Sequence, residues 1–173
     1  MIEIRLNKED LYDCRRAGNF RWQLARAAGI KDHENALATK VKKSSMQQYD
    51  IIGIKGEMAV ARLYDLDFDA YKGGIDEGID LFYDGVSIDV KSTTHTNGKL
   101  IFKTKDAFKS QVGILAVELK ENLIGIPGWI TREEFKEISI PYGIKGGVCV
   151  TQDDLKLPES LWGKMINRRN KRK

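Results

Sequence analysis

The fold of this chain is decided by one stretch, Gly78-Ile79-Asp80-Leu81-Phe82-Tyr83-Asp84-Gly85-Val86-Ser87-Ile88-Asp89-Val90-Lys91. Apolar and polar residues alternate on both sides of Asp84-Gly85. Such alternation is typical of strands, and an Asp-Gly pair between two strands is a strong signal for a two-residue hairpin turn. We therefore predict a β-hairpin that turns at Asp84-Gly85.

The predicted turn sets the pairing of the two strands: Tyr83 with Val86, Phe82 with Ser87, Leu81 with Ile88, and Asp80 with Asp89. Alternate residues share a face of a strand, so Asp80, Asp89 and Lys91 are expected on one side of the hairpin. Two carboxylates opposite one another in a ladder repel, which favours a cation between them.

The residues Asp80, Asp89 and Lys91 suit the hydrolysis of a phosphodiester. Carboxylate oxygens bind a hard divalent ion such as Mg²⁺ at about 2.0–2.1 Å, with several waters retained. Such an ion can polarise a phosphoryl oxygen and activate water, while an ammonium group orients that water or stabilises the developing charge. The alternative is an exposed hairpin in which Asp89 and Lys91 form a weak surface ion pair. The acid predicted across the ladder at Asp80 favours the site.

Composition places the chain among ordinary soluble proteins, since its 173 residues are 42% hydrophobic and 31% charged. This length fits one domain with a real core. The net charge of +4 and the pI near 9.0 permit nucleic-acid binding without requiring it.

Charge is distributed unevenly along the chain. Acids cluster between Asp65 and Lys91, whereas the tail from Lys164 is basic, with Arg168 and Arg169, and has no acid. An acidic pocket in a basic surround suits a metal-dependent enzyme that acts on a polyanion. A solvated, frayed terminus explains the tail equally well.

The two cysteines, Cys14 and Cys149, lie far apart and outside any Cys-x-x-Cys pattern. This argues against a disulfide scaffold or a structural zinc site. The first residues are charged and no long apolar run follows, so we expect no signal peptide, no membrane span and a cytoplasmic location.

The chain before the hairpin is predicted to be mainly helical. A short strand at Ile2–Leu6 should lead to a helix that Asn7 or Asp10 caps and that ends near Ala28. This helix mixes arginines with aromatic residues, a combination that suits either DNA contact or core packing: Arg15, Arg16, Arg21, Arg26, Phe20 and Trp22. A second helix is expected over Asp32–Lys43.

The stretch Ser45–Leu66 is predicted to be one long and largely buried helix, because its apolar positions fill more than one stripe. Gly53 and Gly56 weaken a helix, so we expect another backbone or a substrate to approach them closely. Glu57 shares a flank with apolar residues, where a carboxylate is costly unless it is paired or coordinating. Glu57 is therefore either a third acid of the site or, if the helix begins later, a surface residue of its first turn.

The remaining elements follow from turn and cap signals. Asn97-Gly98 is predicted to join Val86–Thr93 to Lys99–Lys103, and Val112–Leu119 and Leu123–Ile130 to be paired strands. Thr131 and Glu134 have the capping-box spacing for a short helix through Glu137. A last strand is expected at Gly147–Val150, and then a closing segment that packs apolar side chains on the domain: Leu155, Leu157, Leu161 and Trp162.

Taken together, Gly56-Glu57-x-Ala59 on a helix, Gly78-x-Asp80 opening a strand and Asp89-x-Lys91 on the next strand resemble the PD-(D/E)XK nuclease superfamily. The resemblance is specific over 53–94 and topological elsewhere. It implies an α/β (α+β) fold with a restriction-endonuclease-like core, in which helices flank a central mixed β-sheet. Two positions depart from the pattern: Ile79 stands where the motif's name has proline, and Asp89 where Glu is commoner.

The resemblance implies a Mg²⁺-dependent deoxyribonuclease, most simply an endonuclease, in which Mn²⁺ can replace Mg²⁺. Asp80, Asp89 and Glu57 would be the metal ligands, and Lys91 would orient or activate the attacking water. The product would carry a 5′-phosphate. Four further residues are candidates for contact with the DNA: Ser92, Thr93, Arg168 and Arg169.

We expect a single domain, with a helical N-terminal extension (1–44), a catalytic core (45–163) and a basic tail (164–173). DNA is the expected partner, no membrane is involved, and a homodimer is one option. Two alternatives stay open. One is a catalytically inactive DNA- or protein-binding module on the same fold; the other is a Holliday-junction-resolving or RNA-cleaving member.

Overall fold

A five-stranded mixed sheet forms the centre of the protein. The computed structural model describes residues 1–27, 43–71, 78–83, 85–143 and 147–161. The strands lie in the order β1 (Ile2–Arg5), β6 (Leu123–Thr131), β5 (Val112–Lys120), β3 (Val86–Thr93) and β2 (Leu81–Tyr83). β3 and β5 are parallel and the other neighbours are antiparallel, so the sheet is mixed.

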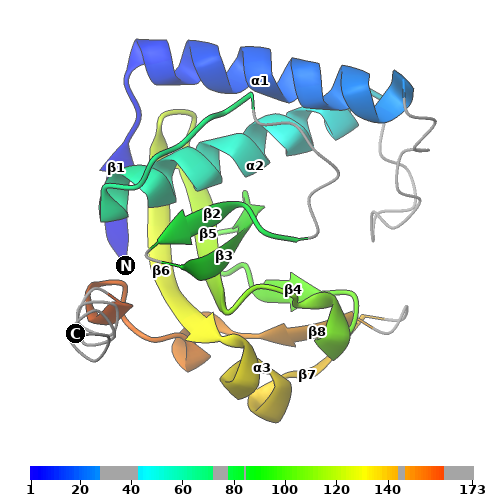
Figure 1. Ribbon diagram of the computed structural model, residues 1–173, viewed down its shortest axis with the longest axis vertical. Coiled ribbons are helices and arrows are strands. Elements are labelled where there is room, and N and C mark those ends of the chain that lie inside the picture. Colours follow the sequence, from blue (N-terminus) through cyan, green and yellow to red (C-terminus); the bar gives the residue numbers. More distant parts are fainter. Residues whose placement is uncertain (28–42, 72–77, 84, 144–146, 162–173) are drawn as a thin grey trace.

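Each face of this sheet is covered by a different layer (Figure 1). On one face lies α2 (Lys43–Tyr64), and α1 (Lys8–Ala27) lies outside it. On the other face lies a three-stranded antiparallel sheet in the order β4 (Leu100–Phe102), β8 (Gly147–Val150) and β7 (Ile140–Tyr142), together with α3 (Arg132–Ile138). Two short 3₁₀ turns, η1 (Lys105–Ala107) and η2 (Gln152–Asp154), complete the described elements.

The central strand β5 is buried on both faces, which explains its continuous apolar sequence. Ile114 and Ala116 belong to the core under the helices, whereas Leu115 and Val117 belong to the core shared with β4, β8 and α3. Because side chains alternate along a strand, one apolar run supplies both cores.

The long helix α2 lies close to the sheet because Gly56 has no side chain. A Cβ at Gly56 would lie 2.0 Å from Ser92 Oγ and 2.9 Å from Ala116 Cβ. Gly53, by contrast, has no protein atom within 4 Å of such a Cβ. A close approach is therefore confirmed for Gly56, whereas no neighbouring element approaches the Cβ position of Gly53.

The predicted hairpin is confirmed, since Tyr83 pairs with Val86, Phe82 with Ser87 and Leu81 with Ile88. Gly85 has a φ of 77°, the left-handed conformation that a glycine adopts without strain. Asp84 lies outside the described residues. Regular pairing stops at Leu81, and the preceding residue, Asp80, donates its backbone N–H to Ile88 O at 2.9 Å. The predicted pairing of Asp80 with Asp89 is therefore wrong, because the ladder ends one residue earlier.

Most other predicted elements are confirmed with small shifts of their ends. They are the first strand, the helix that follows it, the long helix, the two long strands, the capped helix and the last strand, which correspond to β1, α1, α2, β5, β6, α3 and β8. Thr131 and Glu134 form the predicted capping box. The helix predicted over 32–43 falls almost wholly outside the described residues, apart from Lys43, which begins α2.

The region after β3 differs from the prediction. A turn does form, with Gly98 N–H donating to His95 O at 2.8 Å, but β4 pairs with β8 and not with β3. The reason lies in the second core, where the Phe102 ring stacks on Phe108 with centroids 4.3 Å apart. Burial of that aromatic ring draws β4 away from the central sheet.

Two smaller predictions for the C-terminal part were incomplete or wrong. The strand β7 was not expected, because three residues interrupted by Pro141 carry little strand signal. In the closing segment Leu161 is buried as expected, but Leu157 is exposed, and Trp162 lies outside the described residues. No helix in the described part of the chain is long and apolar enough to cross a membrane.

Candidate active site

Asp89 and Lys91 lie on the face of β3 that is turned away from α2. Ile88 and Val90 alternate with them and join the core under the helices. Asp89 is 1% exposed, whereas the Lys91 side chain is 40% exposed, so the ammonium group opens to solvent. Lys91 Nζ lies 2.5 Å from Asp89 Oδ1 and 5.2 Å from the centre of the Phe102 ring.

Asp80 takes the place of a missing strand partner. Beyond Leu81 the ladder between β2 and β3 ends, and the Asp80 carboxylate accepts the Val90 N–H at 2.6 Å. A backbone N–H that the ladder leaves unpaired is thereby satisfied. The bond also fixes the Asp80 carboxylate at the edge of β3, beside Asp89.

Glu57 reaches the same region from the middle of α2 and is 5% exposed. Both of its oxygens accept hydrogen bonds from Arg21 of α1, at 2.8 Å each. The predicted need for a partner is confirmed, and the possibility of a first-turn surface residue is wrong. Arg21 was not predicted as a site residue, although it continues the buried stripe of α1 through Cys14 and Gly18 at helical spacing.

Asp80 interacts electrostatically with both Glu57 and Asp89. Burial, followed by the charges of Glu57 and Asp89, raises the pKa of Asp80 from 3.8 to about 8. The Val90 N–H and Lys91 oppose this rise only in part. An acid in these surroundings keeps its proton at neutral pH unless a further cation enters the site.

The donor set fits a magnesium ion better than a metal with a full protein cage. Among the described residues, no group of three or more His, Cys, Asp and Glu side chains is placed to hold a metal ion. Mg²⁺ needs no such group, because it is typically bound by one or two carboxylates, with waters and substrate phosphates completing its shell. Asp80 and Asp89 could supply that number of ligands, while Glu57 is engaged by Arg21.

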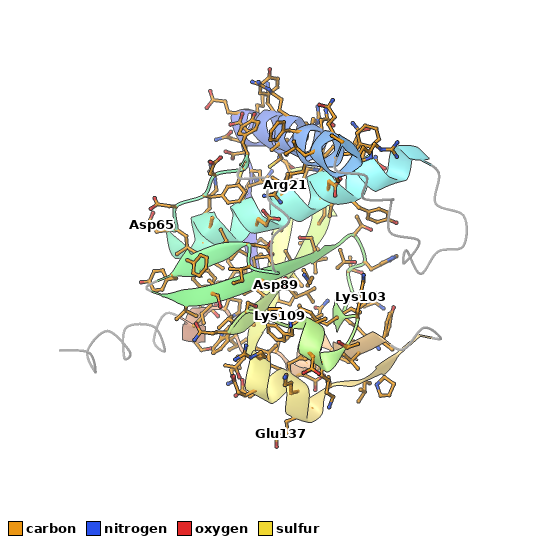
Figure 2. The ribbon with its side chains drawn as sticks, turned by 45° about the vertical axis from the view of Figure 1, so that its right-hand side comes forward. Arg21, Asp65, Asp89, Lys103, Lys109 and Glu137 are labelled. Atoms are coloured by element: carbon orange, nitrogen blue, oxygen red, sulfur yellow. The ribbon has the colours of Figure 1, made fainter. Side chains whose placement is uncertain are left out.

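Basic residues lie on the other side of Asp89 from Arg21 (Figure 2). Lys109 is near Asp89, since a Cβ added at Gly78 would lie 3.7 Å from Asp89 Oδ2 and 4.0 Å from Lys109 Cβ. Lys103 and Lys109 are both exposed. The basic tail that the charge distribution along the sequence singled out lies outside the described residues.

Of the four residues predicted to contact DNA, the structure describes Ser92 and Thr93. Ser92 lies under α2, where its Oγ donates to Gly53 O at 3.5 Å, and Thr93 Oγ1 accepts the His95 N–H at 3.1 Å. Arg168 and Arg169 lie outside the described residues.

A pocket of about 510 Å³ lies apart from these residues, between the first half of α2 and the β5–β6 turn. Arg15, Lys55 and Glu118 line it, but none of the four predicted catalytic residues does. Lys55 Nζ is held by Glu118 at 2.5 Å and by Glu121 O at 2.9 Å. Because no predicted catalytic residue lines this pocket, we place the candidate site at Asp80 and Asp89 and not in the pocket.

Arg21→Ala is expected to destabilise the protein by about 1–2 kcal/mol, because it leaves Glu57 buried beside Asp80 without its cation. Urea unfolding at pH 7.5 with EDTA measures the effect. Adding Glu57→Gln should recover most of the loss. The control is Arg15→Ala, which breaks an exposed pair with Glu121 and should cost at most about 0.5 kcal/mol. Equal losses for Arg15→Ala and Arg21→Ala would contradict the assigned role.

Comparison with family models, with curated proteins and with solved structures finds no match for this chain. The resemblance noted above therefore rests on the residues of Gly56-Glu57, Asp80 and Asp89-x-Lys91 and on their arrangement.

Proposed function

We propose that the protein is a metal-dependent nuclease that hydrolyses DNA phosphodiester bonds and has the restriction-endonuclease-like fold of the PD-(D/E)XK superfamily. One observation carries this proposal. Burial, together with the charges of the buried acids Glu57 and Asp89, raises the pKa of Asp80 to about 8, and the Lys91 side chain is partly exposed beside them. Repulsion of this kind destabilises the fold, so its presence favours a functional cation over a structural role.

Asp80 and Asp89 would hold Mg²⁺ or Mn²⁺. The bound ion would supply Lewis-acid activation of the phosphoryl group and of water. Asp80 is positioned for this by the Val90 N–H, and Asp89 by its ion pair with Lys91. Glu57 belongs to the same proposal as a third ligand, which requires its pair with Arg21 to open.

Lys91 would act on the substrate directly. Its ammonium group is fixed near Asp89 by the ion pair and lies over the Phe102 ring, yet it stays open to solvent. From there it can donate a hydrogen bond to a phosphate oxygen or to the attacking water. Lys109 borders the site and would hold a neighbouring phosphate of the polyanion.

A second candidate function is a silent DNA- or protein-binding module. Two ion pairs favour it, Arg21–Glu57 and Lys91–Asp89, since together they neutralise two of the three acids without a metal. Asp80 argues against it, because a protein that only binds has no use for a carboxylate so strongly disfavoured in its charged form.

The proposal of a nuclease also includes a cytoplasmic location and a homodimer.

The test is incubation with plasmid, linear duplex, single-stranded and branched DNA and with RNA, in Mg²⁺, Mn²⁺ or EDTA. We expect cleavage of DNA with either ion, none in EDTA, and none for Lys91→Met or Asp89→Asn. Lys120→Met, at an exposed position of β5, should cleave normally. Cleavage that persists in both site variants would disprove the assignment, and binding without cleavage would identify the silent module. Cleavage of RNA or of junctions alone would identify the other alternative.

A further inference from the structure

An exposed group of aromatic rings surrounds an arginine on the outer side of α1. Tyr12, Phe20 and Tyr71 are 59%, 40% and 39% exposed. The Arg16 guanidinium lies 5.6 Å from the Tyr12 ring centre and 5.8 Å from that of Tyr71. The Phe20 and Tyr71 rings meet edge to face, with centroids 6.3 Å apart. We call Tyr12, Arg16, Phe20 and Tyr71 the aromatic platform.

The aromatic platform is joined to the candidate site through its neighbours in the chain. Tyr12, Arg16 and Phe20 follow one another at intervals of four residues, so they form one stripe on α1. Phe20 directly precedes Arg21, which is hydrogen-bonded to Glu57. A ligand on the platform would therefore lie on the helix that also carries a residue of the candidate site.

The charge around the platform is uneven. From Cys14 to Ala27, α1 carries Arg15, Arg16, Arg21 and Arg26 and no acid. Two acids lie near the platform: Asp13 follows Tyr12 in the chain, and Asp69, two residues before Tyr71, accepts the Tyr71 N–H at 2.9 Å. Arg15 and Arg21 are paired with Glu121 and Glu57, whereas Arg16 lies between the exposed rings of Tyr12 and Tyr71. The platform thus combines a guanidinium with exposed rings, which complements a polyanion that has flat apolar groups.

We infer that the aromatic platform binds unpaired DNA bases, so that the substrate of the proposed nuclease has a single-stranded segment. This inference rests on the proposed function for the site and adds the class of substrate. Base pairs of a duplex hide the faces of their bases, whereas a single strand exposes them to aromatic and guanidinium groups. A protein partner would not need the arginines of α1.

Binding is measured by fluorescence anisotropy with a labelled 20-nucleotide thymidine oligomer and with a blunt duplex of the same length, in EDTA. We expect Phe20→Ala and Tyr71→Ala each to weaken single-strand binding about tenfold, with duplex binding unchanged within about twofold. Phe20→Trp should retain affinity and Phe20→Leu should lose it, because stacking needs a ring. Ile138→Ala, an exposed apolar residue at the end of α3 on the opposite side of the molecule, is the control.

Three results would overturn the inference: no binding of the single strand, equal loss for single strand and duplex, or a self-associating protein that Phe20→Ala turns into a monomer in sedimentation. Cleavage is scored separately with Asp80→Asn. If the wild-type protein cleaves no DNA in any metal while the platform still binds single strands, the proposed function is wrong and the platform stands. If cleavage is confined to duplex DNA and Phe20→Ala leaves it unchanged, the proposed function stands and the inference about the platform is wrong.

Discussion

Asp80→Asn is expected to stabilise the metal-free protein at pH 8 and to abolish its proposed cleavage. Burial and the charges of Glu57 and Asp89 raise the pKa of Asp80 from 3.8 to about 8. Between these values the unfolded chain releases its proton while the folded chain keeps it, so stability falls as the pH rises. Asparagine has no charge and can still accept the Val90 N–H. The gain should be about 2–4 kcal/mol at pH 8–9.

The measurement is urea unfolding in EDTA at a series of pH values from 5 to 9. The wild-type protein should lose stability up to about pH 8, and Asp80→Asn should show a flatter profile. The control is Asp106→Asn. Asp106 is exposed, and its hydrogen bond and ion pair with Lys136 lower its pKa, so this variant should gain no stability at high pH. Parallel profiles for wild type and Asp80→Asn would contradict the assigned charge cluster.

The same substitution should show the opposite effect on function. Loss of one of the two carboxylates proposed to bind the metal is expected to lower the cleavage rate about a thousandfold or more, which corresponds to about 4 kcal/mol in the barrier. In the wild-type protein, Mg²⁺ must displace the proton of Asp80, so its stabilising effect in thermal unfolding should grow as the pH rises towards about 8. A variant that is more stable and inactive separates the function of Asp80 from any role in folding.

Gly56→Ala is expected to destabilise the protein by about 2–3 kcal/mol, although alanine is the better helix former. The added Cβ would lie 2.0 Å from Ser92 Oγ and 2.9 Å from Ala116 Cβ, so α2 would have to move away from the sheet. Ser92 can rotate its hydroxyl, but Ala116 has no such freedom. Glu57 follows Gly56 on α2, and a shift of the helix should therefore also lower cleavage.

Gly53→Ala is the matched control for this prediction, one helical turn away on α2. No protein atom lies within 4 Å of its added Cβ, so the variant should be more stable by about 0.5–1 kcal/mol. Urea unfolding at pH 7 compares the two variants. A loss of similar size at both positions would mean that the helix interior, and not the contact with β3, responds to the change.

The local elements of this protein were predictable because their signals lie within a few residues. Asp84-Gly85 with alternating flanks gave the correct pairing of β2 with β3, and Thr131 with Glu134 gave the correct start of α3. Glu57 was correctly expected to be buried and to need a partner. The placement of β4 was missed because Asn97-Gly98 reports a turn and not which strand pairs after it.

By itself, the amino-acid sequence determined the hairpin, the helices and strands around it, and the positions of Asp80, Asp89 and Lys91 on adjoining segments. Periodicity, turn residues and caps act over short distances and survive any change in how the elements pack. Only the tertiary structure decided that Arg21 is the partner of Glu57, that Asp80 satisfies the Val90 N–H, and that β4 belongs to a second sheet. Burial and charge pairing join residues far apart in the chain, so no local pattern contains them.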